Sequence, residues 1–414
     1  MLAKKALLVI GDGMGDRPVE ELGGFTPLEI ARKPFMSKLA REGECGIMDP
    51  IAPGIRAGSD TAHLSILGYD PYKYYTGRGA FEAAGIGLQV ERGDICFRCN
   101  FATVDENSFV VIDRRAGRIR EGTHLLAQAL DGMEIEGVKV FFKESVEHRA
   151  GLVLRGEGLG HNVTDADPHK EGEKVHTVEA LEPSDAPSKK TARIVNEFVK
   201  RSFEILKDHP VNKERKAQGL PPANIVLPRG AGTAPHIPPF QERYKLSGAC
   251  IVEVGLLKGV GRYLKMDVID VEGATGSLDT DEQAIARAVL SALEKHDFVL
   301  CNVKAPDVAG HDGEAYKKVE AVEKIDRMLG TILSQISPED VIIVLTADHS
   351  TPVSVKDHSG DPVPIVFWGD GVRTDNVDCF GERPCASGGL GRIRGFDIMN
   401  ILTNLLSVQE KFGA

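Results

Sequence analysis

Six carboxylate and imidazole side chains lie in short segments that suit metal binding. They are Asp12, Asp307, His311, Asp348, His349 and His358. This mixture of oxygen and nitrogen ligands suits Mn²⁺, Zn²⁺, Co²⁺ or Mg²⁺ better than Ca²⁺. The set exceeds the needs of one tetrahedral site, whereas two ions about 3.5 to 4 Å apart would use all of it. Because such ion pairs stabilise the attacking and leaving oxygens of phosphoryl transfer, the set predicts two-metal phosphoryl chemistry.

Ser59 is a candidate nucleophile for that chemistry. Gly58 before it allows a tight turn, and residues 61–67 have the pattern of a helix start. At a helix N-terminus, backbone N–H groups and the positive end of the dipole stabilise an alkoxide and an incoming phosphoryl group. Thr61 is the alternative nucleophile, and a serine that only caps the helix is the non-catalytic alternative.

The glycine-rich loop 11–16, Gly-Asp-Gly-Met-Gly-Asp, also invites a dinucleotide-binding interpretation. Its G-x-G-x-G spacing differs from G-x-G-x-x-G, and Asp12 would face a pyrophosphate with a like charge. A carboxylate at this position fits a metal better.

Other charged groups lack a comparable context. We expect ordinary surface or hydrogen-bonded histidines at His63, His124, His176, His209, His236 and His296. At Arg114, Arg115, Arg118 and Arg120 we expect a solvated turn, with an anion-binding patch as the alternative.

Continuous apolar runs and helical stripes alternate at both ends of the chain. The runs are 6–10, 298–303, 341–345 and 364–368. They predict strands covered on both faces by helices, and the stripes within 284–293 and 319–333 predict those helices. The fold class is therefore α/β with a doubly wound, mostly parallel sheet. Ligands gather beyond the carboxyl ends of such strands, so we expect Asp12, Asp307 and Asp348 to converge.

The middle of the chain differs in texture. It carries many charges, glycine-rich turns and short strand candidates at 94–104, 138–142 and 151–154. A chain of 414 residues is also long for one core. We therefore predict an inserted α+β domain over 71–245, and a discontinuous domain formed by 1–70 and 246–414.

The composition of the chain limits the classes of partner that we expect it to bind. A formal net charge of −11 argues against nucleic acid, yet local arginines can still hold a small anionic substrate. Seven cysteines, an odd number, indicate reduced thiols and a cytoplasmic protein. The first apolar run is too short for a signal peptide or a membrane span, so we expect no membrane partner. A homo-oligomer is compatible with the sequence.

Four segments together resemble the archaeal type of cofactor-independent phosphoglycerate mutase, of the alkaline phosphatase superfamily. They are 11–16, 57–63, 305–312 and 346–351, the last followed by His358. The resemblance covers nearly the whole chain, and segments 227–232 and 255–262 support the assignment within the superfamily. It implies an alkaline-phosphatase-like sheet, an insert that binds substrate and acts as a lid, and two divalent metal ions. Mn²⁺ is the first candidate for these ions. The resemblance implies no 2,3-bisphosphoglycerate cofactor.

The resemblance also implies roles for particular residues. One ion would be held by Asp307, His311 and His358. The other would be held by Asp12, Ser59, Asp348 and His349, with Ser59 becoming a transient phosphoserine. The implied substrate contacts are Arg229 and Lys258, with Arg149, Arg155 and His161 as further candidates.

The implied enzyme is an isomerase of glycolysis and gluconeogenesis that interconverts 3-phosphoglycerate and 2-phosphoglycerate. Two alternatives share the superfamily: a metal-dependent phosphatase, in which water takes the phosphoryl group, and a phosphosugar mutase such as phosphopentomutase. A metal-binding module without catalysis is disfavoured by the full ligand set together with a serine.

Overall fold

The computed structural model describes residues 4–411 and 413. The chain forms two compact units, leaving the first after Tyr74 and returning to it at Ile237, whereas the sequence suggested boundaries after 70 and 245. Helix α9 (Phe240–Tyr244) belongs to the first unit for a physical reason. The Phe240 ring packs against Phe298 with centroids 4.8 Å apart, and the Tyr244 hydroxyl donates to the Leu67 carbonyl at 2.8 Å.

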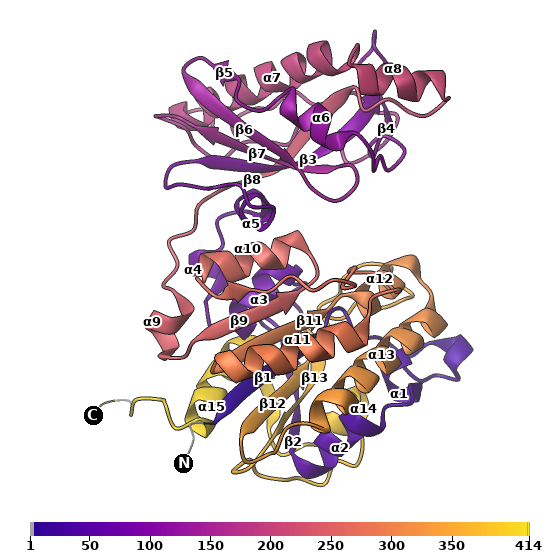
Figure 1. Ribbon diagram of the computed structural model, residues 1–414, viewed down its shortest axis with the longest axis vertical. Coiled ribbons are helices and arrows are strands. Elements are labelled where there is room, and N and C mark those ends of the chain that lie inside the picture. The colour runs from indigo at the N-terminus through magenta and orange to yellow at the C-terminus, as the bar shows by residue number, and fades with distance from the viewer. Residues whose placement is uncertain (1–3, 412, 414) are drawn as a thin grey trace. The chain divides into compact units, whose positions relative to one another are not determined.

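The first unit is built on a mixed, mostly parallel sheet (Figure 1). Its strands are β1 (Lys5–Gly11), β2 (Glu44–Asp49), β9 (Gly248–Val252), β10 (Asp267–Val268), β11 (Phe298–Val303), β12 (Val341–Thr346), β13 (Val363–Trp368) and β14 (Gly391–Arg394). In the described part of the chain their order is β10-β9-β11-β1-β12-β13-β2-β14. Only the β12–β13 and β13–β2 pairs of this order are antiparallel. The predicted doubly wound α/β class is confirmed.

Helices cover this sheet. Besides α9 they are η1 (Glu20–Leu22), α1 (Pro27–Ile30), α2 (Pro34–Glu42), α3 (Ser59–Ile66), α4 (Pro71–Tyr74), α10 (Gly255–Tyr263), α11 (Glu282–Lys295), α12 (Ala305–Asp312), α13 (Ala315–Leu333), α14 (Glu382–Cys385), η2 (Gly395–Asp397) and α15 (Ile398–Leu405). The two predicted helical stripes are confirmed as α11 and α13, which lie side by side (Figure 1). Asp281 caps α11 by accepting hydrogen bonds from the backbone N–H groups of Gln283 and Ala284.

The burial of the central strands explains why their sequences are apolar. Every residue of β11 and β12 is buried, and β1 is buried from Ala6 to Gly11. Strands that lose water on both faces gain from continuous apolar runs rather than alternating ones. The polar residues that follow these strands therefore stand at the edge of a large apolar core.

The second unit, Tyr75–His236, is a separate α+β unit. Its strands are β3 (Ile95–Val104), β4 (Val111–Asp113), β5 (Glu134–Ile135), β6 (Val138–Glu144), β7 (Arg149–Arg155) and β8 (Ile225–Thr233). Its helices are α5 (Arg78–Gly85), α6 (Thr123–Gln128), α7 (Ala186–Leu206) and α8 (Pro210–Ala217). The strands pair antiparallel, with β3 between β7 and β8, and α7 packs on β8. Across both units, no helix among the described residues is both long and apolar enough to cross a bilayer.

A fully buried lysine connects α13 to the loops that follow β1 and β12. Lys318 Nζ donates to Asp16 Oδ2 at 2.8 Å, to the Gly15 carbonyl at 2.9 Å and to the Thr351 carbonyl at 2.8 Å. Burial lowers the pKa of Lys318, and the neighbouring Asp16 carboxylate opposes that shift. A buried charge is tolerated only when it is paired and hydrogen-bonded, so this contact fixes both loops against the helix.

Replacing this lysine should destabilise the first unit strongly. Lys318→Met removes the cation paired with buried Asp16 and one donor from each of the two carbonyls, which we expect to cost about 3 to 5 kcal/mol in the free energy of unfolding. Denaturant unfolding measures the loss. Lys317→Met, on the exposed side of the same helix, is the control and should change stability by less than about 0.5 kcal/mol. Equal effects of the two substitutions would contradict the interpretation.

Candidate metal centre

The carboxyl ends of β1, β11 and β12 bring the candidate ligands together. Asp12 directly follows β1, Asp307 lies in α12 beyond β11, and Asp348 and His349 follow β12. These four residues are at most 2% exposed. The convergence expected from the topology is present in the structure.

Asp12, Asp348 and His349 form the first group, with ligand atoms within 4.8 Å of one another. His349 Nε2 lies 3.3 Å from Asp348 Oδ2 and 3.7 Å from Asp12 Oδ1. Asp348 Oδ1 accepts a hydrogen bond from Gly13 N at 3.0 Å, whereas its buried Oδ2 has no hydrogen-bond partner among the described residues. An orphaned buried carboxylate oxygen is costly, so it marks a place for a cation.

The close packing of these loops requires a glycine at position 13. Its φ is +60°, and a Cβ there would lie 2.6 Å from Thr351 Oγ1 and 2.7 Å from the Cβ of Asp307. Any side chain would push the loops after β1 and β12 apart. The glycine-rich loop thus serves close packing around carboxylates.

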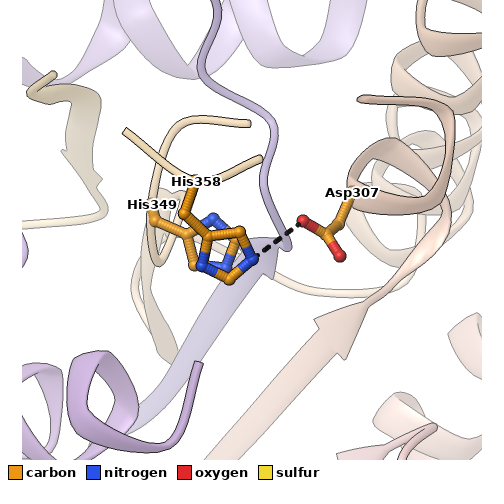
Figure 2. Close-up of side chains that lie close together, drawn as sticks. All are labelled: Asp307, His349 and His358. Carbon is orange, nitrogen blue, oxygen red and sulfur yellow. Dashed lines mark ion pairs between the residues drawn. The ribbon is translucent and has the colours of Figure 1, made fainter. Parts of the chain in front are cut away.

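Asp307, His349 and His358 form the second group (Figure 2). The rings of His349 and His358 stack with centroids 3.6 Å apart, and His358 Nε2 lies 3.5 Å from Asp307 Oδ1. His311 Nε2 is also 3.5 Å from Asp307 Oδ1, although His311 lies outside the compact group. His349 therefore belongs to both groups.

The protonation of His349 follows from its partners. The Thr351 hydroxyl donates to Asp307 Oδ1 at 2.6 Å, so its oxygen accepts from His349 Nδ1 at 3.1 Å. Burial lowers the pKa of His349 to about 3, with a further contribution from His358, so the ring is neutral near pH 7. The proton is thus on Nδ1, and Nε2 keeps a lone pair for a metal or a hydroxyl.

His358 and His311 are oriented in the same way. His358 Nδ1 lies 2.8 Å from the Ala57 carbonyl, and His311 Nδ1 lies 3.0 Å from the Lys356 carbonyl. Because carbonyls only accept, each Nδ1 carries a proton, and each Nε2 faces the Asp307 carboxylate. Such backbone contacts are typical of metal-ligating histidines.

Buried negative charge dominates this place. Burial raises the pKa of Asp12, and the Asp348 carboxylate raises it further. The ammonium group of Lys304 opposes that shift, lying 2.7 Å from Asp12 Oδ1 and 2.7 Å from Asp307 Oδ2. The carboxylates already attract one cation of the chain itself, so positive charge is favoured here.

Ser59 lies against the first group. It is the first residue of α3, and its Oγ is 3.2 Å from His349 Nε2. The Thr61 hydroxyl, the alternative nucleophile, donates instead to the Gly58 carbonyl at 3.0 Å. The geometry therefore favours Ser59.

His63 is hydrogen-bonded, as expected, but it also lies next to the first group. It is fully buried, and its Nδ1 lies 2.7 Å from the Ser59 carbonyl. Asn302 Nδ2 lies 3.2 Å from His63 Nε2 and donates to Asp12 Oδ2 at 3.1 Å. The sequence could have predicted this position, because His63 follows Ser59 by four residues and therefore lies on the same face of the helix.

The second unit holds an arginine-rich cavity of about 180 Å³. Its cationic lining is Arg98, Arg114, Arg115, Arg118, Arg149 and Arg229. Four buried atoms that line it have no hydrogen-bond partner among the described residues: Arg98 Nε, Asn100 Oδ1, His148 Nδ1 and Arg229 Nε. Arg114, Arg115 and Arg118 lie in a turn, as expected, with Arg115 and Arg118 exposed, and the same three side chains also line the cavity. Orphaned donors among guanidinium groups indicate a site for an anion.

The other candidate substrate contacts are placed differently. Lys258 pairs with Asp270 in the first unit. Arg155 pairs with Asp94 at 2.7 Å, and His161 is exposed. Of the five candidates, Arg149 and Arg229 line the cavity in the second unit.

The fold and the two ligand groups define an α/β protein with a candidate divalent-metal centre. A family model described as 2,3-bisphosphoglycerate-independent phosphoglycerate mutase matches residues 40–212, and one described as type I phosphodiesterase / nucleotide pyrophosphatase matches 172–362. A protein named 2,3-bisphosphoglycerate-independent phosphoglycerate mutase 1, from Methanothermobacter thermautotrophicus, is 56% identical over 414 residues, 99% of this chain and 100% of the relative. The chain belongs to the family of 2,3-bisphosphoglycerate-independent phosphoglycerate mutases, which confirms the resemblance.

Solved structures agree with this assignment. A protein from Pyrococcus horikoshii superposes with a TM-score of 0.88 at 44% identity and covers 100% of both chains. The cofactor-independent phosphoglycerate mutase from Thermoplasma acidophilum superposes with a TM-score of 0.72 at 40% identity, over 97% of this chain and 100% of that one.

Family membership implies divalent metal ions, and the residues present fit them. Three histidines turn Nε2 toward carboxylates, and Asp348 Oδ2 is buried without a hydrogen-bond donor among the described residues. Nitrogen and oxygen atoms that converge in this way can ligate a divalent cation.

Metal binding should be visible as thermal stabilisation. We expect Mn²⁺ added to chelator-treated protein to raise the melting temperature, with about 2.7 kcal/mol of stabilisation when free metal is 100 times its Kd. Asp348→Asn removes the charge but keeps the shape, so it should lose most of that stabilisation. Asp370→Asn, at an exposed carboxylate of the same unit, is the control and should respond as wild type. An unchanged metal response in Asp348→Asn would reject Asp348 as a ligand.

Proposed function

We propose that this protein interconverts 3-phosphoglycerate and 2-phosphoglycerate through a phosphoserine at Ser59, without 2,3-bisphosphoglycerate. The observation that carries the proposal is the position of Ser59 Oγ, 3.2 Å from the unprotonated Nε2 of His349 at the start of α3. Relatives that are 52 to 56% identical over nearly the whole chain carry the name of this mutase. The reaction belongs to glycolysis and gluconeogenesis in the cytoplasm, which suits seven cysteines that form no disulfide.

The proposed ligand sets are close to the two groups, but Ser59 is added to the first and His311 takes the place of His349 in the second. Asp307, His311 and His358 would hold one ion, and Asp12, Ser59, Asp348 and His349 the other. When bound, the ions would lower the pKa of the Ser59 hydroxyl and offset charge on the phosphoryl group. Mn²⁺ is the first candidate because the set mixes oxygen and nitrogen, and Mg²⁺, Co²⁺ and Zn²⁺ fit the same ligands.

The residues of the chain then perform the transfer. Ser59 Oγ bonds to phosphorus as the bond from phosphorus to the substrate's O3 breaks; the serine loses its proton and the departing oxygen gains one. Backbone N–H groups at the start of α3 stabilise the charged phosphoryl group on Ser59. The glycerate then turns, and its O2 takes the phosphoryl group back. Water must be excluded while the glycerate turns, because it would hydrolyse the phosphoserine.

In this proposal the second unit binds the substrate and acts as a lid. Its cavity offers guanidinium groups, among them Arg149 and Arg229, for the carboxylate and phosphate of phosphoglycerate. The orphaned donors Arg98 Nε and Arg229 Nε support an anionic ligand of this size. An arginine grip would retain the free glycerate until it is phosphorylated again.

Removing the nucleophile tests the intermediate. In an enolase-coupled assay without 2,3-bisphosphoglycerate, we expect Ser59→Ala to lower kcat on the order of 10⁴-fold or more. Thr61→Ala is the control, because the Thr61 hydroxyl bonds to Gly58 instead of facing His349. Retained activity in Ser59→Ala would reject the phosphoserine, and phosphate release without 2-phosphoglycerate in wild type would favour the phosphatase alternative.

Removing one guanidinium group tests the cavity. Asp167 keeps its pair with Arg114 when Arg229 is replaced, so the second unit should still fold. We expect Arg229→Met to raise KM for 3-phosphoglycerate by roughly 30-fold, about 2 kcal/mol, as loss of a buried charge contact predicts. Arg193→Met, on the exposed surface of the same unit, should leave KM unchanged. An unchanged KM in Arg229→Met would exclude Arg229 from substrate binding.

A further inference from the structure

His63 connects the sheet of the first unit to the candidate nucleophile. It lies in α3, and its Nδ1 is 2.7 Å from the Ser59 carbonyl oxygen and 3.6 Å from Asp348 Oδ2. Its Nε2 is 3.2 Å from Nδ2 of Asn302, the penultimate residue of β11. Both His63 and Asn302 are fully buried. The imidazole ring therefore bridges a central strand and the first residue of a helix.

The hydrogen bonds of this ring have one consistent assignment. Asn302 Nδ2 donates to Asp12 Oδ2 at 3.1 Å, so the Asp12 carboxylate fixes which way the Asn302 amide points. The second N–H of that amide then donates to His63 Nε2. Because the Ser59 carbonyl can only accept, His63 Nδ1 carries a proton and donates it to that carbonyl. The strand thus holds His63 on one side, and His63 holds Ser59 on the other.

The start of α3 needs such a restraint. Helix ends fray, and an attacking atom that is misplaced by about 1 Å can lose roughly 100-fold in rate. At Gly58 the carbonyl accepts from Ala62 N at 2.9 Å and from the Thr61 hydroxyl at 3.0 Å. The Ser59 carbonyl receives its side-chain donor from His63. Side chains of the first turns therefore fix both peptides that flank the candidate nucleophile.

We propose that His63 is a positioning residue, which fixes the backbone of Ser59 so that its Oγ is aligned for attack on the phosphoryl group. This inference rests on the proposed function and adds a residue outside both proposed ligand sets. Because His63 acts through Ser59, it affects the transfer step instead of substrate binding. Its removal should therefore lower kcat and leave KM for 3-phosphoglycerate unchanged.

Two amide substitutions separate the two contacts of the ring. His63→Asn places its amide nitrogen near the position of Nδ1, so it keeps a donor for the Ser59 carbonyl. His63→Gln places its amide near the position of Nε2, so it keeps only the contact with Asn302. In the enolase-coupled assay we expect His63→Gln to lower kcat roughly 10- to 100-fold. His63→Asn should stay within about three-fold of wild type, and both variants should keep the wild-type KM.

Crystal structures of the metal-free variants give a readout that does not depend on turnover. We expect Ser59 Oγ to stay next to His349 Nε2 in His63→Asn and to move away from it in His63→Gln. The control is His296→Gln, at a histidine of the same unit that pairs with Asp267 outside the centre. This control should match wild type in kcat and KM.

Three results would overturn the inference: wild-type kcat in His63→Gln, equal losses of kcat in both variants, or a Ser59 side chain that keeps its position in His63→Gln. A lower kcat together with a raised KM and a lower melting temperature would show a purely structural role and overturns it as well. His63→Leu keeps neither contact and carries the expectations of His63→Gln if that variant does not fold. Wild-type protein that forms no 2-phosphoglycerate rejects the proposed function itself, and the inference falls with it. A failure confined to the His63 variants leaves the proposed function intact.

Discussion

The buried ammonium group of Lys318 is the contact on which the site depends. It holds the Gly15 carbonyl and the Thr351 carbonyl at once, so the loops after β1 and β12 cannot separate without exposing a charge to the apolar core. Once Thr351 is fixed, its hydroxyl orients both Asp307 and His349. His349 then presents a lone pair to Ser59. The buried ammonium group of Lys318 therefore helps to fix which nitrogen of His349 carries the proton, and this ring faces Ser59.

Parallel topology creates the second constraint. Because β9, β11, β1 and β12 run in the same direction, their carboxyl ends meet at one edge of the sheet and bring acidic side chains together. Buried carboxylates raise one another's pKa, as for Asp12 beside Asp348, and such a cluster is stable only with cations. Lys304 supplies one of them from within the chain. The fold therefore produces a strong demand for positive charge before any ligand is considered.

The sequence predicted the parts of this site that depend on local pattern. Apolar runs located β1, β11, β12 and β13, and residues just beyond them, such as Asp12 and Asp348, were predicted ligands because strand ends are where ligands gather. Lys304 was missed because its role depends on a long side chain reaching across two strand ends, which no spacing within one segment encodes. The arginine cavity was missed for a related reason. Arg98, Arg149 and Arg229 come from three paired strands, β3, β7 and β8, whose register places them together only in the folded unit.

The two units have binding sites for ligands of opposite charge, and the proposed reaction needs both sites. Carboxylates of the first unit concentrate cations, whereas guanidinium groups of the second attract anions, although the net charge of −11 suggests neither site. While the phosphoryl group is on Ser59, the glycerate must be held through its carboxylate. Arginines serve this purpose because they cannot lose their charge and bind carboxylates in a bidentate way. Placing them in a separate unit also keeps them from displacing metal ions at the carboxylates. A hydrolase has no need to retain its leaving group, so an anion cavity in a chain that also has a candidate metal centre favours the mutase over the phosphatase.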